Sequence, residues 1–509
     1  MAPASTTIGK LQRLLTRIDV VQWRSNRPSG IRCRYSRIDR RILYFPSILK
    51  PNDWYYYPQD NITTVAAFTN RHDPVILPEY DPKRIAGCYK HIKKFVRHPN
   101  KLTKQQYVDR ISDSTKRALY QRALADIEQG RGYSTRVQPF TKIEKLPATK
   151  YKAPRMIQAR HLSFNIEYGV YIKPLEDALS ANKHFGKGNY LDIGRKVHKL
   201  QQKYRFYTEA DHSNFDAHIT VEQLRLTHTF YQSCYRHNPK LRNLSSKTLS
   251  NSCSTRDGVR YKARGSRMSG DVDTSLGNSL INYAIIKDVL HKLNISGEAI
   301  VNGDDSIIFT NTPIPQEKAA KLFLKYNQET KIMQSQSNIR KVEFCRTKLI
   351  MNNHGQPTMM IDPIRLNDIF GMTYKSTSDY SEHCRQVIAC NIACNSSNPL
   401  YSYWKEIYEK VYGKLTTAAL MSAMIKTLEK KHKMIALKNM TSSPDEGEFN
   451  PTVYEAHGNI DRIQDDKNKL IQKLSRIKAA PRLSIAHMEQ QTTAMTILVN
   501  HQAKTITKI

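Results

Sequence analysis

Two adjacent carboxylates, Asp304 and Asp305, follow a glycine in the run Val301–Phe309. Ala299–Val301 leads into this turn and Ile307–Phe309 leads out of it, with residue types that favour half-buried strands. The pattern predicts a β-hairpin with both aspartates at its tip. Because Mg²⁺ takes oxygen ligands, such a pair suits a divalent cation site. Gly and Asp are also common in ordinary hairpin turns, so other segments must decide between the two interpretations.

A second acidic pair lies upstream, in Thr208–His218. Asp211 follows a strand-like segment, and Asp216 comes five residues later, across a turn. We expect Asp211 to join Asp304 and Asp305 in holding metal ions, with Asp216 farther out and facing a sugar. Three crowded carboxylates would repel one another strongly without cations. A helix N-cap and a surface aspartate are the alternative for this segment read alone.

Small and hydroxyl-bearing residues occupy Gly265–Asn278, where a helix is predicted to begin. They allow close approach of a polynucleotide backbone, and free amides and side-chain oxygens there can contact a sugar. Asn278 and Asp216 together could read a ribose 2′-OH, which both donates and accepts hydrogen bonds. A capped helix without a ligand is the alternative. The candidate nucleotide-binding residues of this segment are Ser269, Gly270, Thr274 and Asn278.

Basic residues are frequent between Phe140 and Arg160, in strand-like backbone punctuated by proline. They could line a channel for the triphosphate of a nucleotide, since Lys supplies a point charge and Arg a bidentate fork. A solvated basic face is the alternative. The candidates are Lys142, Lys145, Lys152, Arg155 and Arg160.

The whole chain is basic, with 80 Lys and Arg against 45 Asp and Glu and a formal net charge of +35. We expect a polyanionic partner, and the 28 tyrosines, which can stack on bases, favour nucleic acid over a membrane surface. An ordinary highly charged soluble protein is the alternative. Eight cysteines without zinc spacing predict reduced thiols. No apolar run approaches the roughly 20 residues that span a bilayer, so we expect a cytosolic protein without its own anchor.

Hydrophobic periodicity predicts the elements that position these residues. Helices are expected at Leu224–Tyr235 and Gly277–Leu290, and strands at Arg205–Ala210 and Ala299–Phe309. Tyr168–Leu175 fits either a helix or a buried strand. Further helices are expected at Ser402–Tyr412 and Thr416–His432.

The order of these motifs resembles that of the RNA-dependent RNA polymerases of positive-strand RNA viruses, and within them the tombusvirus-like and nodavirus-like enzymes. The resemblance covers roughly residues 138–350. It rests on five ordered segments: Pro154–Arg160, Asp211–His218, Arg267–Asn278, Gly303–Asp305 and Val342–Cys345.

This resemblance implies an α+β right-hand polymerase fold, with fingers, a palm that carries an antiparallel sheet with helices, and a helical thumb. The expected divisions are 1–130, an N-terminal extension that forms part of the fingers; 131–203, fingers with the basic motif; 204–345, the palm, with a fingers insertion around 236–265; 346–440, the thumb; and 441–509, a polar, flexible tail.

The resemblance also implies two-metal-ion nucleotidyl transfer on an RNA template, for genome replication and transcription. Asp211 and Asp304 would bridge two Mg²⁺ ions, for which Mn²⁺ could substitute, with Asp305 assisting. Lys331 is the candidate acid that protonates pyrophosphate, and the turn at Phe344 and Cys345 the candidate primer grip. A surface lysine and a plain hairpin are the respective alternatives.

The implied partners are template and product RNA, NTPs and other viral replication proteins. The implied location is the host cytoplasm, with recruitment to membrane-associated replication complexes through a partner. Two rival functions remain open. A reverse transcriptase shares the carboxylates, but Asp216 and Asn278 suit ribose. A non-catalytic RNA-packaging protein would explain the charge but not the acidic trio.

Overall fold

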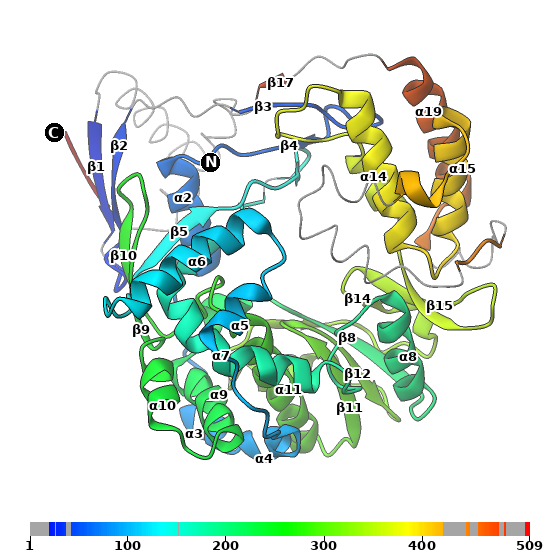
Figure 1. Ribbon diagram of the computed structural model, residues 1–509. Helices are drawn as coiled ribbons and strands as arrows, with labels where there is room; N and C mark the ends of the chain where they lie inside the picture. Colours follow the sequence, from blue (N-terminus) through cyan, green and yellow to red (C-terminus); the bar gives the residue numbers. More distant parts are fainter. Residues whose placement is uncertain are drawn as a thin grey trace, which may run out of the picture.

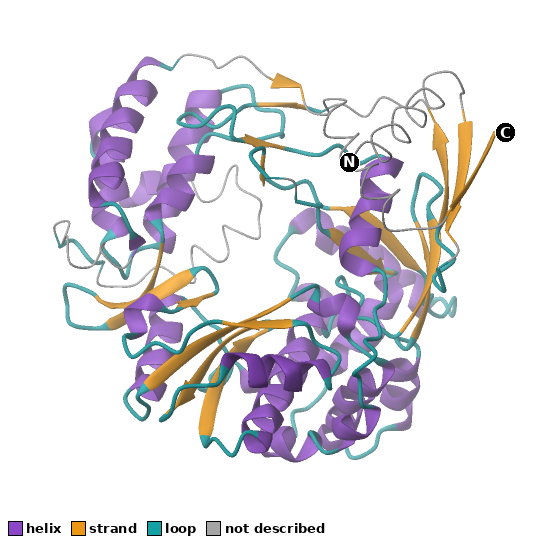
Figure 2. Cartoon of the chain, turned by 180° about the vertical axis from the view of Figure 1, so that it is seen from behind, coloured by secondary structure: helices purple, strands orange, loops and turns teal. Residues whose placement is uncertain are grey.

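The computed structural model describes residues 20–25, 27–36, 42–150, 152–420, 444–447, 457–477, 483–484 and 504–508. Helices and mostly antiparallel strands form three groups of elements around a common centre (Figures 1 and 2). A four-stranded sheet with its helices lies at the bottom of Figure 1, a seven-stranded sheet at the upper left and a helical layer at the upper right.

The central sheet has the strand order β11-β12-β8-β13, and each neighbouring pair is antiparallel. In the β11–β12 hairpin Asn302 pairs with Asp305, which leaves Gly303 and Asp304 as a two-residue turn. In the β8–β13 pair Asp211 lies directly opposite Lys331. The strands are β8 (Phe206–His212), β11 (Gly297–Asn302), β12 (Asp305–Thr310) and β13 (Thr330–Ile332).

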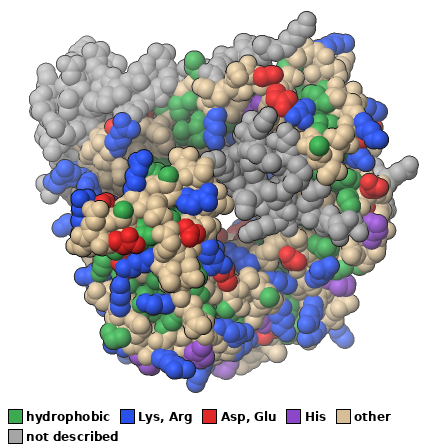
Figure 3. Space-filling view, viewed as in Figure 1, with side chains coloured by type: hydrophobic (Ala, Val, Ile, Leu, Met, Phe, Trp, Pro, Cys, Tyr) green, Lys and Arg blue, Asp and Glu red, His purple; other side chains and the backbone are tan. Residues whose placement is uncertain are grey.

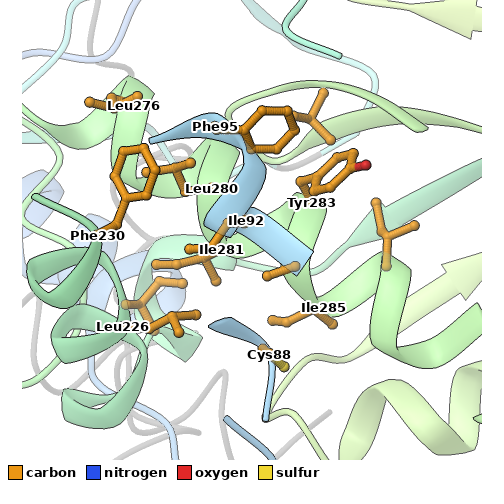
Figure 4. Close-up of a cluster of buried hydrophobic side chains, with 14 of the residues drawn as sticks. Cys88, Ile92, Phe95, Leu226, Phe230, Leu276, Leu280, Ile281, Tyr283 and Ile285 are labelled. Atoms are coloured by element: carbon orange, nitrogen blue, oxygen red, sulfur yellow. The ribbon is translucent and has the colours of Figure 1, made fainter. Parts of the chain in front are cut away.

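One face of this sheet is covered by helices, of which α11 contacts the Gly303–Asp304 turn. Ala299, Val301 and Ile308 face a large core in which Phe230, Leu280 and Ile281 are also buried (Figure 4). Because side chains alternate along a strand, the intervening residues face the other way. The elements on this side are α3 (Pro82–Ala86), α4 (Tyr89–Ile92), η2 (Lys93–Phe95), α7 (Leu162–Leu179), α9 (Val221–Cys234), α11 (Thr274–Lys292) and α12 (Gln316–Leu324).

The opposite face packs on one helix and a small antiparallel sheet. Tyr207, Ile300 and Ile307 of the central sheet share a core there with Val197 and Phe344. This packing brings the β14–β15 turn to the tip of the β11–β12 hairpin. The elements are α8 (Tyr190–Gln201), η4 (Ile339–Lys341), β14 (Glu343–Phe344), β15 (Thr347–Met351) and β16 (Pro357–Ile361).

The seven-stranded sheet has the order β18-β1-β2-β10-β9-β5-β7, and most of the basic motif lies in the connection between its last two strands. Its strands are β1 (Val20–Ser25), β2 (Arg32–Ser36), β5 (Val137–Thr141), β7 (Met156–Arg160), β9 (Ser250–Ser254), β10 (Arg260–Arg264) and β18 (Lys504–Lys508). Nearby helices are α2 (Asn61–Ala67), the π-helix η1 (Phe68–His72), α5 (Lys104–Asp109), α6 (Ser114–Glu128) and α10 (Pro239–Ser246).

The helical layer packs around Trp404, which is fully buried and stacks on Phe370. The prediction of a flexible tail over residues 441–509 is wrong for part of that range, because residues 460–476 form the helix α19, which packs against this core. Its apolar residues recur on one face, and Ile463 and Leu470 are completely buried. The helices of the layer are α13 (Pro363–Ile369), α14 (Tyr380–Cys394), α15 (Leu400–Tyr412) and α19 (Ile460–Arg476).

Residues 42–57 contact both upper groups of elements. The Phe45 amide donates to the Thr373 carbonyl (2.9 Å), and the Ala148 amide donates to the Asp53 carbonyl (2.8 Å). The N-terminal segment thus joins the helical layer to the loop of the basic motif. The short strands involved are β3 (Leu43–Tyr44), β4 (Trp54–Tyr55), β6 (Leu146–Pro147) and β17 (Leu483–Ser484).

The strands expected at Arg205–Ala210 and Ala299–Phe309 are confirmed, as are three of the helices, which correspond to α9, α11 and α15. Tyr168–Leu175 belongs to a helix, α7, which is long and buried. Most of the helix expected at Thr416–His432 lies outside the described residues. All eight cysteines lie among the described residues and are thiols rather than disulfides, as predicted.

A charged network connects α11 to the edge strand β11, which leads into the Gly303–Asp304 turn. The Glu298 carboxylate accepts from the Tyr283 hydroxyl (2.9 Å) and lies 3.4 Å from Lys287 Nζ and 3.7 Å from Lys94 Nζ. Burial acts to raise the pKa of Glu298, but the charges of His184, Lys287 and Lys94 outweigh it and hold the pKa below its ordinary value. Burial lowers the pKa of His184, so the two lysines supply the positive charge at neutral pH.

We therefore expect Glu298→Gln to lower the free energy of unfolding at pH 7 by about 1–2 kcal/mol. The lowered pKa contributes stability above the ordinary pKa of about 4.3, which is lost as pH falls through the lower folded-state value. Urea unfolding should thus show a difference from wild type at pH 7 that shrinks below about pH 4. Glu128→Gln, at an exposed carboxylate, is the control. An equal difference at both pH values would contradict the network.

Candidate active site

Helix α11 holds the turn that carries Asp304. Gly303 has φ +60°, a conformation that glycine adopts readily at the first central position of a two-residue hairpin. Its amide donates to Ser279 Oγ (2.8 Å), and its carbonyl accepts from Asn282 Nδ2 (3.1 Å). Oδ1 of the same Asn282 accepts from His212 Nε2 (2.9 Å), next to Asp211. One helix therefore ties together both acidic segments.

The two aspartates of the turn have different surroundings. Asp304 is exposed, whereas Asp305 accepts from the amides of Cys345 (2.7 Å) and Ser306 (2.8 Å). Burial, with smaller contributions from the charges of Asp304 and Asp211, raises the pKa of Asp305 to about 6, although the two amides act to lower it. Although Asp304 keeps an exposed surface, partial desolvation by the surrounding protein raises the pKa of its carboxyl group, with a contribution from the charge of Asp211. The three carboxylates are therefore close enough to repel one another.

Asp211 lies at the end of β8, beside the β11–β12 hairpin, and is exposed. Glu209, two residues earlier on the same face of the strand, was not singled out from the sequence. Burial raises its pKa to about 7, and Asp211 and Asp305 add to the effect. Lys331 is exposed and lies opposite Asp211 in the adjacent strand. Its role as a proton donor stays a prediction.

The carboxylates fit hard divalent cations. Within the described part of the chain, no group of three or more His, Cys, Asp or Glu side chains is arranged to hold a metal ion as it stands. A Mg²⁺ site commonly takes only one or two protein carboxylates and completes its shell from water and substrate phosphate. Asp211 and Asp304 supply exposed oxygen donors, and their mutual repulsion with Asp305 is what bound cations would relieve.

Asp216 and Asn278 are in direct contact, as their proposed joint role requires. Asn278 Nδ2 donates to Asp216 Oδ1 at 2.8 Å. Asn214 precedes this site in the left-handed conformation (φ 47°), which asparagine tolerates, and the short helix η3 (Phe215–His218) follows. Burial, with a contribution from the charge of Asp304, raises the pKa of Asp216 to about 6. The Asp216–Asn278 pair therefore lies near the turn that carries Asp304.

Ser269 and Gly270 lie in the loop between β10 and α11, and Thr274 is the first residue of α11. Ser269 Oγ donates to the Met156 carbonyl (2.9 Å) and accepts from the Gln158 amide (3.0 Å). A Cβ at Gly270 would lie 2.7 Å from the Gln158 carbonyl oxygen, so only glycine fits this approach. Thr274 Oγ1 donates to the Met268 carbonyl (2.9 Å). These residues therefore shape and anchor the loop; direct contact with a nucleotide stays a prediction.

Two cations of the basic motif are paired with an acid from the same motif. Arg155 donates to Glu144 from Nε (3.0 Å), and Lys142 Nζ lies 3.6 Å from the same carboxylate. Hydrogen bonding to Glu144 raises the pKa of Arg155, and Asp304 and Asp216 act in the same direction. Arg155 therefore lies on the side of the motif that faces the acidic site. Both basic side chains are about half exposed.

The other three candidates of this motif differ among themselves. Lys152 is exposed, and burial of its ammonium together with Arg71, Arg346 and Arg155 lowers its pKa, which places it in a positive cluster. Lys145 is exposed. After burial, its positive charge is the next cause of the lowered pKa of His383 in α14, so Lys145 lies near the helical layer. Arg160 is 2% exposed and forms a buried bidentate pair with Asp271 at 3.0 and 2.9 Å. Its guanidinium is thus occupied inside the fold and is not presented to a triphosphate.

The Phe344–Cys345 turn also departs from expectation. The Phe344 side chain is fully buried, so it has no surface with which to contact a primer. Cys345 and Arg346 both have positive φ (50° and 62°), which costs conformational energy for residues other than glycine. This strained turn delivers the Cys345 amide to Asp305. The turn thus supports the Asp305 carboxylate, and a primer contact stays a prediction for its backbone.

Several residues near the site escaped sequence analysis. Ser275, Ser279 and Asn282 repeat at helical spacing on α11, a polar stripe that could have been noticed. Lys187 donates to Ser275 Oγ and to Asn302 Oδ1 (3.1 Å), and nothing in its local sequence marks it. Arg71 reaches the site from the π-helix η1, a rare element that often occurs at functional sites.

Comparison with known proteins decides the family. A model described as viral RNA dependent RNA polymerase matches residues 68–449. The chain belongs to this family. It is 29% identical over 307 residues to an RNA-directed RNA polymerase of Panicum mosaic virus, a match that covers 55% of this chain and 31% of the relative. It is 29% identical over 296 residues to that of Red clover necrotic mosaic virus, covering 52% and 39%.

The chain is also similar to an RNA-directed RNA polymerase of Tobacco necrosis virus. The two are 26% identical over 381 residues, a longer match that covers 68% of this chain. Even there the chain covers 51% of the relative, so it corresponds to about a third to a half of these proteins' length. The suspected family membership is confirmed. In the described residues, no helix combines the length and the apolar composition that crossing a membrane requires.

Proposed function

We propose that this chain is an RNA-directed RNA polymerase that joins nucleotides on an RNA template. The observation that carries the proposal is the meeting of Asp211 on β8 with Asp304 and Asp305 on the adjoining hairpin, beside the Asp216–Asn278 pair. Family membership supports the same reaction. Within this proposal the chain has a right-hand arrangement. The seven-stranded sheet would be the fingers, the central sheet the palm and the helical layer the thumb.

Asp211 and Asp304 would hold the divalent cations, with Asp305 kept in place by the Cys345 and Ser306 amides. When bound, two Mg²⁺ ions would supply activation of the primer 3′-OH and charge stabilisation for the leaving pyrophosphate. Asp216 and Asn278 would contact the ribose. Lys142, Lys152 and Arg155 would receive the triphosphate, which would replace Glu144 as the partner of Arg155.

Template and product RNA would be held by the basic surface of the chain. Lys and Arg side chains are spread over the face shown in Figure 3, where Asp and Glu are fewer. Such a surface binds phosphates without reading sequence. Action in the host cytoplasm, with other viral proteins bringing the enzyme to membrane-associated replication complexes, remains part of this proposal.

The test is incorporation of labelled NMPs on a defined RNA by the purified chain, with and without primer, in Mg²⁺, in Mn²⁺ and with EDTA. We expect template-dependent product of defined length in either metal and none with EDTA. Preference for dNTPs would favour a reverse transcriptase. Metal-independent RNA binding without synthesis under every condition would favour a packaging protein.

A further inference from the structure

Arg267 is a buried cation that contacts the Asp216–Asn278 pair from the interior of the protein. It is 1% exposed, donates from Nε to Asn278 Oδ1 (2.9 Å), and its Nη1 lies 3.1 Å from Asp273 Oδ2. Asp273 is completely buried and also accepts from the Tyr231 hydroxyl (2.9 Å). A Cβ at Gly277 would overlap Arg267 Nη2, so the glycine in the first turns of α11 makes room for the guanidinium.

The contact determines which way the Asn278 amide points. A carboxamide has an oxygen that only accepts and a nitrogen that only donates, whereas a guanidinium has only donors. Arg267 therefore draws Asn278 Oδ1 toward itself, and Nδ2 is left facing Asp216 Oδ1 at 2.8 Å. In the reversed orientation, two donors would oppose each other at Arg267 and two acceptors at Asp216. That orientation would leave buried groups unsatisfied.

Arg267 is joined to Asp216 by its main chain as well. The Arg267 amide donates to the Asp216 carbonyl (2.9 Å), and the neighbouring Ser266 amide donates to the Ile219 carbonyl (2.7 Å). Arg267 thus holds both the main chain of Asp216 and the side-chain amide of Asn278. The polarity of the Asp216–Asn278 pair is set by a side chain that lies behind it and is closed to solvent.

We propose that Arg267 is a positioning residue for sugar discrimination. By fixing the Asn278 amide, it keeps a carboxylate oxygen of Asp216 available to accept from a ribose 2′-OH, with Asn278 Nδ2 as the neighbouring donor. A 2′-deoxyribose has no 2′-hydroxyl to donate to this carboxylate oxygen. The inference rests on the proposed polymerase function and names the residue that makes its sugar site selective.

The test uses Arg267→Met combined with Asp273→Asn, because removing the arginine alone would leave a buried, uncompensated carboxylate. The matched control is Arg160→Met combined with Asp271→Asn. It removes the other buried Arg–Asp pair of this loop, which makes no contact with Asn278 or Asp216 among the hydrogen bonds of the described residues. The measurement is the ratio of kcat/KM for ATP to that for dATP on one RNA template, alongside the Tm of each protein.

We expect the ratio to fall about tenfold or more in the Arg267 pair and to change less than about twofold in the control, although both lose Tm. Arg267→Lys provides a second variant if the double variant does not fold. Its ammonium can still neutralise Asp273 but cannot reproduce the planar fork, so the ratio should fall with little loss of Tm.

A wild-type ratio in either Arg267 variant, or equal losses of the ratio in both double variants, would overturn the role of Arg267. This outcome differs from failure of the proposed function, in which the wild-type protein itself makes no template-directed product. A wild-type protein that copies RNA without preferring ATP to dATP would overturn the positioning role alone.

Discussion

Asp304→Asn should abolish template-directed nucleotide incorporation while template RNA still binds. The substitution keeps the shape of the side chain but removes the charge with which Asp304, as the proposed ligand at the hairpin tip, would bind a divalent cation. Loss of metal-assisted charge stabilisation is worth several kcal/mol, and each 1.4 kcal/mol is tenfold in rate, so we expect a loss of about 10³-fold or more. RNA affinity should persist because it depends on the many Lys and Arg residues.

The measurement pairs NMP incorporation on a defined RNA with filter binding of the same RNA. Glu317→Gln, at an exposed carboxylate in the first turn of α12, is the control and should keep activity within about twofold. Asp305→Ala should also be inactive, since it additionally releases the amides of Cys345 and Ser306. A purified Asp304→Asn protein with activity near wild type would end the metal-site assignment.

Asn278→Ala and Asp216→Ala should each reduce the preference for NTPs over dNTPs. A site built to bind a hydroxyl rejects the analogue that lacks it, because the buried polar groups are then left unpaired. Removing either partner of the 2.8 Å hydrogen bond dismantles that site, and we expect the ratio of kcat/KM for ATP to that for dATP to fall by about 10²-fold. Asn243→Ala, at an exposed residue of α10, should leave the ratio unchanged.

The same ratio should depend on pH in the wild-type protein. Burial raises the pKa of Asp216 to about 6, so its carboxylate is ionised at pH 7.5 and loses acceptor capacity below pH 6. Discrimination should therefore weaken as pH falls, even after correction for the overall rate. If both alanine variants discriminate between the sugars as wild type does, Asp216 and Asn278 have no part in sugar choice.

Local pattern was enough to predict the elements that carry the chemistry. Short apolar runs on either side of a glycine turn specify the β11–β12 hairpin, because strand preference and turn conformation are properties of neighbouring residues. The same holds for α9, α11 and α15, whose apolar residues recur at helical spacing. Residue chemistry also suggested that Asp216 and Asn278 act together on a ribose; the two side chains are in contact, and the ribose role stays a prediction.

Local pattern failed where a side chain's partner lies far away in the chain. Arg160 and Arg155 look alike in sequence, but Arg160 meets Asp271 in the interior and Arg155 meets Glu144 at the surface. Phe344 looks like an exposed grip yet packs into a core with Tyr207 and Ile300. Burial of this kind is decided by which elements pack together.

The polar composition of residues 441–509 predicted a tail, yet α19 packs on the helical layer with Ile463 and Leu470 buried. A narrow apolar stripe in a charged helix becomes stable only when another surface covers it. The sequence by itself thus determined the acidic hairpin, its supporting helices and the chemistry available to them. Only the tertiary structure decided which cations face the site and which are enclosed, because desolvation and pairing depend on contacts between distant segments.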